Sequence, residues 1–297
     1  MKRDRNFVWH RVDARSLDLK GMKVAVVGGT GGIGRALSRF IASRGAIVLV
    51  VGQTFRDSNV PGIEFIKGDL SLMREAQRVA ELLPAENLDL VIFTTGIMAA
   101  PKREETTEGI ERDMAVSYLS RLVILRNIAP RLGNGPRRTT IKPRVFIMGY
   151  PGTGQAGKLD DLNAEKYYGS MAAHMSTVAG NEMLVLDSAK RYPNATFFGL
   201  NPGFVSTNIR SNFLGADTIR YRVIEWLTGL MTPSADDYAE RLVPLLVSPD
   251  LEGHDAAMFD RKGFAILSSP RLTDDYTRKY IAASEALVAR ADVRLAS

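Results

Sequence analysis

The sequence predicts a doubly wound α/β fold built on a mainly parallel sheet of about seven strands. Three observations predict it. Short, continuous apolar runs recur along the chain, longer stretches with helical spacing separate them, and the first run ends in a cluster of glycines. Continuous apolar strands are typical of a parallel sheet that is covered on both faces. Right-handed crossovers between such strands place helices on both of those faces.

The predicted elements follow one another in a regular order. Apolar runs predict strands over residues 23–28, 47–51, 63–66, 88–93, 145–148 and 196–200. Apolar residues at helical spacing predict helices over residues 32–44, 71–83, 107–130, 170–191 and, as an amphipathic closing helix, 272–293. No change of composition marks an internal boundary. We therefore expect one domain over residues 21–297, preceded by a polar extension over residues 1–20.

Composition excludes several classes of function. The chain has no cysteine, which excludes disulfides, thiolate metal ligands and thiol nucleophiles. His10, His174 and His254 lie far apart without the spacing of metal ligands, so no metal site is expected. The first residues carry charges but no apolar stretch, and no run approaches the length of a membrane span. A cytoplasmic protein is therefore expected.

The net charge of +6 raises the question of an anionic partner. The densest basic stretch also contains glycines and a proline, which predicts a loop. A nucleic-acid or anionic-membrane patch is one interpretation, and a solvated connection is the other. We favour the solvated connection, and expect no nucleic-acid partner, because no nucleic-acid motif accompanies the stretch. Its basic residues are Arg131, Arg137, Arg138, Lys142 and Arg144.

The glycine cluster directly follows the first predicted strand, as Gly-Gly-Thr-Gly-Gly-Ile-Gly over residues 28–34. It fits both the G-x-G-x-x-G and the G-x₃-G-x-G template. Glycine permits the tight turn, and bare backbone N–H groups at a helix N-terminus bind a pyrophosphate. The strand–turn–helix context predicts a dinucleotide site, with a tight turn without ligand as the alternative. The expected contacts are Gly28, Thr30, Gly31, Gly32, Ile33, Gly34 and Arg35.

The residue after the second strand normally selects the nicotinamide cofactor, because an acid there holds the ribose 2′-hydroxyl of NAD. Here Gln53 follows the strand, and the first acid is Asp57. Arg35 and Arg56 lie where they could meet a 2′-phosphate, although both could simply be solvated. We therefore expect NADP rather than NAD, with Gln53 among the cofactor contacts.

Four further motifs follow later apolar runs and loops. They are Gly-Asp-Leu-Ser at residues 68–71, Thr-Thr-Gly-Ile at 94–97, Asp-Leu-Asn-Ala-Glu-Lys at 161–166 and Asn-Pro-Gly-Phe-Val-Ser-Thr at 201–207. With the glycine loop they make about residues 20–290 resemble a short-chain dehydrogenase/reductase, and more closely its retinol-dehydrogenase-like branch. The resemblance implies a seven-stranded Rossmann fold, NAD(P) binding and alcohol–carbonyl interconversion. It also implies cofactor contacts at Asp69, Leu70, Thr95, Gly96, Pro202, Gly203, Val205 and Thr207.

The catalytic positions differ from those of the family, which uses Tyr-x-x-x-Lys on the helix after strand five. No tyrosine of this chain is followed by lysine at that spacing. A gap-free comparison puts His174 at the tyrosine and Val178 at the lysine. Tyr150 stands where the family has its serine, and Ser117 where it has its asparagine.

Carbonyl reduction needs a hydride from the nicotinamide and a proton for the developing alkoxide. His174 is a candidate donor because an imidazole titrates near ~6.5. Tyr150 is a second candidate, and Ser117 could hold a water. The alternative is that these residues line the pocket of a protein that has lost catalysis.

The segment over residues 207–232 is rich in apolar and aromatic residues. The resemblance implies a substrate lid there, and hence a hydrophobic small-molecule substrate. Core packing or a dimer surface is the alternative, so a homo-oligomer stays open. The sequence thus indicates an atypical NADP(H)-dependent oxidoreductase that acts on a carbonyl, an alcohol or another reducible group. Two alternatives stay open, a non-redox cyclase or isomerase that keeps the cofactor as a scaffold and a nucleotide-binding pseudoenzyme.

Overall fold

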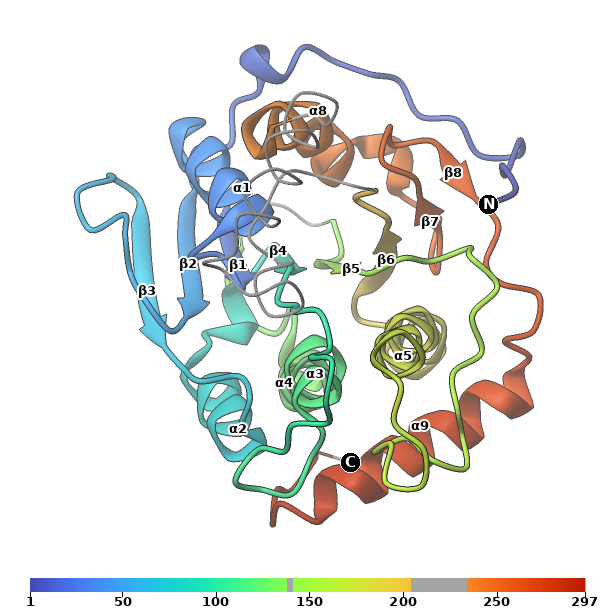
Figure 1. Ribbon diagram of the computed structural model, residues 1–297. Helices are drawn as coiled ribbons and strands as arrows, with labels where there is room; N and C mark the ends of the chain where they lie inside the picture. Colours follow the sequence, from blue (N-terminus) through green and yellow to red (C-terminus); the bar gives the residue numbers. More distant parts are fainter. Residues whose placement is uncertain (138–140, 204–233, 297) are drawn as a thin grey trace, which may run out of the picture.

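One sheet runs through the middle of the molecule, with helices packed on both of its faces (Figure 1). This computed structural model describes residues 1–137, 141–203 and 234–296. The strands lie in the order β3-β2-β1-β4-β5-β6-β7-β8, and all pairs are parallel except β7 with β8. Their bounds are β1 Lys23–Val27, β2 Ile47–Gly52, β3 Ile63–Lys67, β4 Leu90–Phe93, β5 Arg144–Met148, β6 Thr196–Leu200, β7 Met258–Phe259 and β8 Ala265–Ile266.

The predicted doubly wound fold is confirmed, and each of the six apolar runs forms a strand. The expectation of about seven strands is one too few for the described sheet. The additional strand is β8, because the chain turns back after β7 and pairs with it antiparallel. Both β7 and β8 have two residues, which is too short to form an apolar run in the sequence.

Helices α1 and α8 cover one face of the sheet, and α2, α4 and α5 cover the other, with α9 packed against α5 (Figure 1). Apolar spacing alone misses α8, although Ser234 and Asp237 form a capping box at its start. The predicted helix over 107–130 is a short α-helix, a π-helical turn and a longer α-helix in succession. The bounds are α1 Gly32–Ser43, α2 Met73–Leu82, α3 Arg112–Met114, the π-turn Ala115–Leu119, α4 Ser120–Ile128, α5 Ser170–Arg191, α8 Ala235–Val247 and α9 Asp274–Ala289.

Two apolar cores lie on the two faces of the sheet, and β1 contributes to both. Ala25 and Val27 join the core beneath α2, α4 and α5. Val24 and Val26 join the core beneath α1 and α8. Successive side chains of a strand point to opposite faces, so a strand covered on both sides must be apolar throughout. The central strands thereby hold their carboxyl ends in fixed positions.

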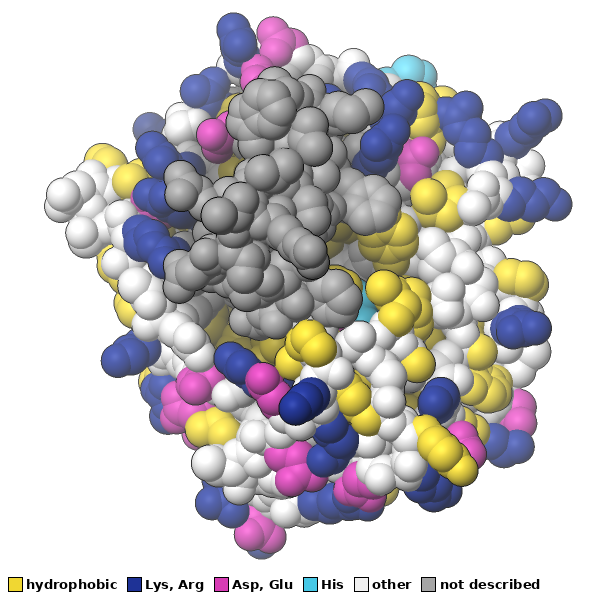
Figure 2. Space-filling model, viewed as in Figure 1, with side chains coloured by type: hydrophobic (Ala, Val, Ile, Leu, Met, Phe, Trp, Pro, Cys, Tyr) yellow, Lys and Arg dark blue, Asp and Glu magenta, His cyan; other side chains and the backbone are white. Residues whose placement is uncertain are grey.

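The N-terminal extension packs against the fold (Figure 1). Phe7 and Trp9 are buried, and the Trp9 indole Nε1 donates to the Gly263 carbonyl oxygen at 2.7 Å. Arg3 pairs with Ile266 in an isolated antiparallel bridge beside β8. The cations of this segment lie on the surface among apolar side chains (Figure 2). A segment that is polar in composition therefore completes the sheet edge.

The basic stretch over 131–144 is more buried than the predicted solvated connection. Arg144 begins β5, is buried, and donates to the Leu246 carbonyl oxygen at 3.1 Å. Arg131 donates to the Ala80 carbonyl oxygen at 2.8 Å, near the end of α2. The interpretation as a solvated connection is wrong for these two residues, because their guanidinium groups satisfy carbonyls of neighbouring elements. Arg138 lies outside the described residues.

Among the described residues, no helix combines the length and the apolar character that a bilayer crossing requires.

Candidate active site

The glycine loop holds the start of α1 directly against the end of β4. Gly28 has a φ of +92°, and a Cβ there would lie 2.5 Å from the Thr95 backbone nitrogen. A Cβ on Gly34 would lie 2.4 Å from the Gly28 carbonyl oxygen. Gly32, at a φ of +49°, also has the left-handed conformation that favours glycine. These positions are glycine because the chain packs on itself there.

Gly31 differs from its neighbours because it faces open space. The nearest atom to a Cβ built on it is Arg56 Nη1, at 3.8 Å. Gly31 is the N-cap of α1, and no side chain caps that helix. The first-turn N–H groups of α1 are thus available to a ligand, at the positive end of the helix dipole. This cradle fits a pyrophosphate, with Thr30 before it and Ile33 packed toward the core behind it.

The predicted adenosine end lies after β2 and β3. Gln53 Nε2 donates to Asp69 Oδ1 at 2.8 Å, and the Ser71 hydroxyl donates to the same oxygen at 2.7 Å. Burial acts to raise the pKa of Asp69, but the hydrogen bonds from Ser71 and Gln53 outweigh it and lower that pKa. Leu70 is buried beside this carboxylate. A hollow of about 520 Å³ opens here, lined by Asp69, Ser71, Leu72, Glu104, Glu105, Thr106, Thr107 and Arg112.

The two arginines expected near a 2′-phosphate have different partners. Arg35 makes a bidentate ion pair with Asp57, with Nε–Oδ2 at 2.8 Å and Nη2–Oδ1 at 2.7 Å. The Arg35 hydrogen bonds lower the pKa of Asp57, whose side chain is buried. Arg56 donates from Nη1 to the Thr30 carbonyl oxygen at 2.9 Å, within the glycine loop. In the sequence, Asp57 lies too far after the second strand to be expected at the ribose 2′-hydroxyl. In the folded protein it lies against Arg35 and pairs with it.

The loops after β4 and β6 carry the remaining predicted cofactor contacts, Thr95 and Gly96 on the adenosine ribose side and Pro202 and Gly203 at the nicotinamide end. Thr95 Oγ1 is buried without a hydrogen-bond partner among the described residues, which leaves a polar atom for a ligand. Gly96 and Pro202 are half-buried beside this edge. Gly203, at a φ of +66°, donates its N–H to Asn201 Oδ1 at 2.9 Å. Val205, Thr207 and the predicted lid over 207–232 lie outside the described residues.

Three polar side chains meet where α3, the π-turn and α5 come together. His174 Nδ1 lies 2.7 Å from Asp113 Oδ2, and Asp113 is fully buried. Ser117 donates its hydroxyl to Asp113 Oδ1 at 2.5 Å and accepts the Ile97 N–H at 3.0 Å. His174 and Ser117 were predicted, and Asp113 was missed. Its only local sign is its position four residues before Ser117, which puts both on one helix face.

The geometry fixes what each group can do. Asp113 occupies Nδ1 of His174, so the other ring nitrogen, Nε2, is the one left to serve a substrate. Ser117 donates its hydrogen bond to the carboxylate and not to the imidazole. The three residues therefore do not form a catalytic triad, in which a histidine base activates a serine nucleophile. Ser117 lies in the π-turn, a distortion that often marks functional sites. The cluster is suited to holding and releasing a proton at His174.

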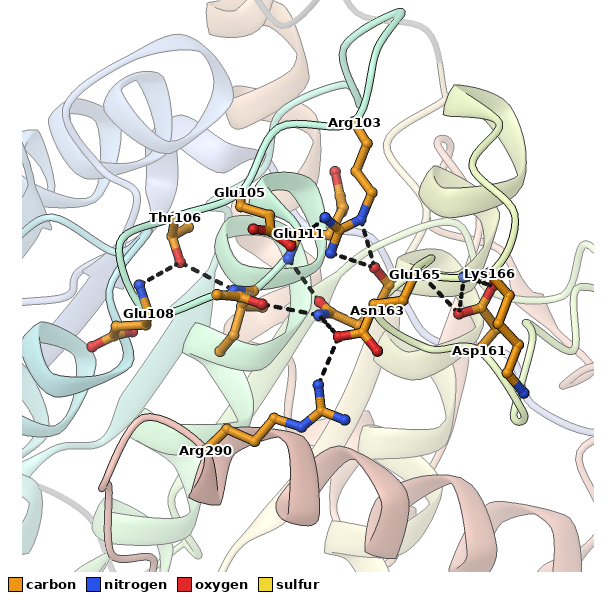
Figure 3. Close-up of polar contacts among 12 residues, drawn as sticks. Arg103, Glu105, Thr106, Glu108, Glu111, Asp161, Asn163, Glu165, Lys166 and Arg290 are labelled. Atoms are coloured by element: carbon orange, nitrogen blue, oxygen red, sulfur yellow. Dashed lines mark hydrogen bonds and ion pairs between the residues drawn. The ribbon is translucent and has the colours of Figure 1, made fainter.

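Two loops fix the start of α3 from outside the cluster (Figure 3). The Glu111 carboxylate accepts the Asp113 N–H at 3.2 Å as the N-cap of the helix. Asn163 Oδ1 in turn accepts the Glu111 N–H at 2.7 Å, and Arg103 donates to the Asn163 carbonyl oxygen at 3.1 and 3.0 Å. The motif at 161–166 therefore positions Asp113 through the helix cap.

Arg121 is a buried cation that no motif in the sequence indicates. Its guanidinium donates to the carbonyl oxygens of Thr95 and Met148, and to Asn181 Oδ1 at 2.9 Å. Burial lowers the pKa of Arg121 to about 9, and the Asp113 carboxylate opposes that shift. Arg121 thus ties the ends of β4 and β5 to α5.

Tyr150 follows β5 and is half-buried. Burial raises its pKa, and the charge of Arg261 opposes the shift. Val178, at the family's lysine position, is buried. No group of three or more His, Asp or Glu side chains suited to a metal ion occurs in the described part of the chain.

A parallel sheet with an uncapped glycine-loop helix and polar groups at its carboxyl edge defines a Rossmann-type nucleotide-binding protein. The chain is 48% identical over 294 residues to an uncharacterised oxidoreductase of Saccharomyces cerevisiae, covering 98% of this chain and 95% of that one. It is 26% identical over 229 residues to retinol dehydrogenase 12 of Bos taurus, covering 71% and 70%.

A solved structure extends the comparison. A short chain dehydrogenase from Shigella flexneri, complexed with NADP, superposes with a TM-score of 0.60 at 16% identity. The match covers 82% of this chain and 98% of that one. No protein-family model matches the chain. The chain belongs to the short-chain dehydrogenase/reductase superfamily of oxidoreductases.

Proposed function

We propose that this protein is an NADP(H)-dependent oxidoreductase that interconverts a carbonyl and an alcohol, or reduces another reducible group, on a hydrophobic small molecule, with His174 as the proton donor. The observation that carries the proposal is the 2.7 Å contact between His174 Nδ1 and the buried Asp113. We further propose a cytoplasmic location for the enzyme.

In this proposal the bound nicotinamide supplies the hydride. His174 Nε2 gives its proton to the oxygen on which the alkoxide charge develops. The Asp113 carboxylate holds the orientation of the ring through its contact with Nδ1. Ser117 holds that carboxylate in place through its hydroxyl, and the Ile97 N–H in turn donates to the Ser117 hydroxyl oxygen. Arg121 and Asn181 keep α5 in register with the ends of β4 and β5.

NADP is favoured over NAD by Arg56, which is held at the glycine loop by its bond to the Thr30 carbonyl. Arg35 is neutralised by Asp57, so Arg56 is the cation we assign to the 2′-phosphate. Asp69 with Gln53 serves the adenosine end, and the first turn of α1 serves the pyrophosphate.

A hydrophobic substrate is supported by exposed apolar side chains that lie shortly before His174 in the sequence. Met171, one turn before His174 on α5, is 57% exposed, and Tyr167 just before that helix is 77% exposed. A bovine relative is named for retinol, an apolar alcohol.

A protein that had lost catalysis would have little reason to keep Asp113 buried against an imidazole. Burying a carboxylate is costly unless its partners compensate. The cluster therefore favours a working proton donor over a pseudoenzyme.

The test is NADPH oxidation with apolar aldehydes and ketones, followed from about pH 5 to pH 10. We expect His174→Ala to lower kcat by ~10²–10⁴, the usual loss of general-acid help. With a histidine donor, kcat falls as rising pH removes the imidazole proton. The raised pKa of Tyr150 would instead preserve activity through that range. Tyr150→Phe is the matched control, and unchanged kcat in His174→Ala would refute the assignment.

A further inference from the structure

Two segments far apart in the sequence form one edge of the molecule. Residues 1–12 run alongside residues 260–271, which contain β8 (Figure 1). Asp4 donates its N–H to the Ala265 carbonyl oxygen at 3.0 Å, and Leu267 donates to the Lys2 carbonyl oxygen at 2.9 Å. The buried Trp9 reaches Gly263 in the same strip. We call residues 1–12 and 260–271 together the basic edge.

The basic edge holds most of the net charge of the chain. It contains seven Lys and Arg residues and two Asp residues, so it accounts for five of the six net positive charges. All seven cations are exposed, and none makes an ion pair with another described residue. Both acids instead accept backbone N–H groups of their own turns. The cations are Lys2, Arg3, Arg5, Arg11, Arg261, Lys262 and Arg271.

Exposed apolar side chains lie among these cations (Figure 2). Val8 is 75% exposed, Val12 51%, Leu267 41% and Phe264 39%. Val8 points outward because its neighbours Phe7 and Trp9 point into the core. Solvated surfaces seldom gather large apolar groups in one strip, so the arrangement indicates a partner that is both apolar and anionic.

We propose that the basic edge binds the surface of anionic lipid membranes, with its cations at the headgroups and its apolar side chains in the interface. Cations beside aliphatic groups are the combination that an interfacial membrane site requires. A single-stranded nucleic acid would instead need aromatic faces for base stacking. Phe7 and Trp9 are buried, and the exposed phenyl ring of this strip, Phe264, has the Arg3 guanidinium over it, 3.6 Å from the ring centroid.

The basic edge adjoins the candidate active site. A Cβ on Gly203 would lie 2.8 Å from Arg261 Cδ, and Gly152, in the loop that follows Tyr150, packs on the Leu267 carbonyl. On the proposed function, membrane docking would therefore bring a bilayer-dissolved apolar substrate close to the nicotinamide end. This consequence rests on the proposed function, whereas the membrane binding itself does not.

The test is co-sedimentation of the full chain, without cofactor or substrate, with vesicles of phosphatidylcholine alone or mixed with phosphatidylserine. We expect binding to the mixed vesicles, little binding to phosphatidylcholine alone, and weaker binding as salt rises. The variant Arg5→Glu with Lys262→Glu should lower the affinity for mixed vesicles by ~10-fold or more. Val8→Ser should weaken binding while its salt dependence persists.

The matched control is Lys20→Glu with Lys142→Glu, which makes the same change in net charge at exposed positions away from the basic edge. This control variant should bind the mixed vesicles with the affinity of the wild type. Equal loss in both double variants, or no vesicle binding by the wild type, would overturn the proposal. Binding of an oligonucleotide in place of vesicles would assign the edge to nucleic acid and also overturn it. NADPH turnover of a water-soluble carbonyl, measured separately, should be unchanged in both double variants.

Discussion

The candidate site has two regions, a cofactor end at the glycine loop and the start of α1, and a chemical end at the cluster of Asp113, Ser117 and His174. Backbone groups form the first region and side chains form the second. At the cofactor end the backbone forms the site. Gly28 and Gly34 allow close backbone contacts, and Gly31 leaves the N-terminus of α1 without a side-chain cap. At the chemical end the side chains of Asp113, Ser117 and His174 form a hydrogen-bonded cluster, to which we assign the chemistry.

On the proposed function, this difference accounts for a cofactor end that keeps the motif of the family and a chemical end that departs from it. A pyrophosphate site made of backbone N–H groups tolerates few substitutions, because its close backbone contacts leave room only for glycine. A proton donor can be any group of suitable acidity held at the right point. On the proposed function, His174 takes the place of the tyrosine, and Asp113 on α3 is the carboxylate that supports it.

The largest effects should come from glycines of the cofactor end. Gly28→Val should destabilise the fold by about 3 kcal/mol or more, because it combines a positive φ with a 2.5 Å contact to backbone. Gly31→Val should leave the fold intact, since nothing lies within 3.8 Å, yet lower NADPH affinity by ~100-fold. Thermal unfolding and calorimetric titration measure the two effects. If Gly31→Val binds NADPH normally, the cradle is misassigned.

An effect on kcat, and not on cofactor affinity, is expected from removing the side chains of the chemical end. Asp113→Asn should lower kcat toward the level of His174→Ala, because the imidazole loses its orienting carboxylate. The double variant should be little worse than His174→Ala alone, since the two residues act as a unit. NADPH affinity should hold in all three. Additive losses in the double variant would mean that Asp113 acts independently of His174.

The smallest effect separates the two arginines of the cofactor end. Arg56→Ala should weaken NADPH by ~10-fold and leave NADH unchanged, because it removes a charge–phosphate contact. Arg35→Ala should mainly lower thermal stability, since it leaves the buried Asp57 unpaired. Parallel titrations with both cofactors check this. Loss of NADPH selectivity in Arg35→Ala but not in Arg56→Ala would reverse the assignment.

The sequence by itself determined the strands, most of the helices and the cofactor loop of this protein. Apolar periodicity and the glycine cluster are local patterns. A strand that is buried on both faces needs an apolar residue at every position, so it appears as a continuous apolar run. The comparison of motifs also predicted His174 and Ser117 as site residues, and the structure brings both against Asp113.

Only the tertiary structure decided how these residues are partnered. Asp113 is 61 residues from His174, and Asp57 is 22 residues from Arg35. Arg121 is 60 residues from Asn181, and the N-terminal segment meets β8 across almost the whole chain. Contacts between distant segments produce no periodic pattern in the sequence, because they depend on how two separate elements pack together in the folded protein. Charge pairing and burial, which decide what each of these groups can do, therefore become visible only when the chain is folded.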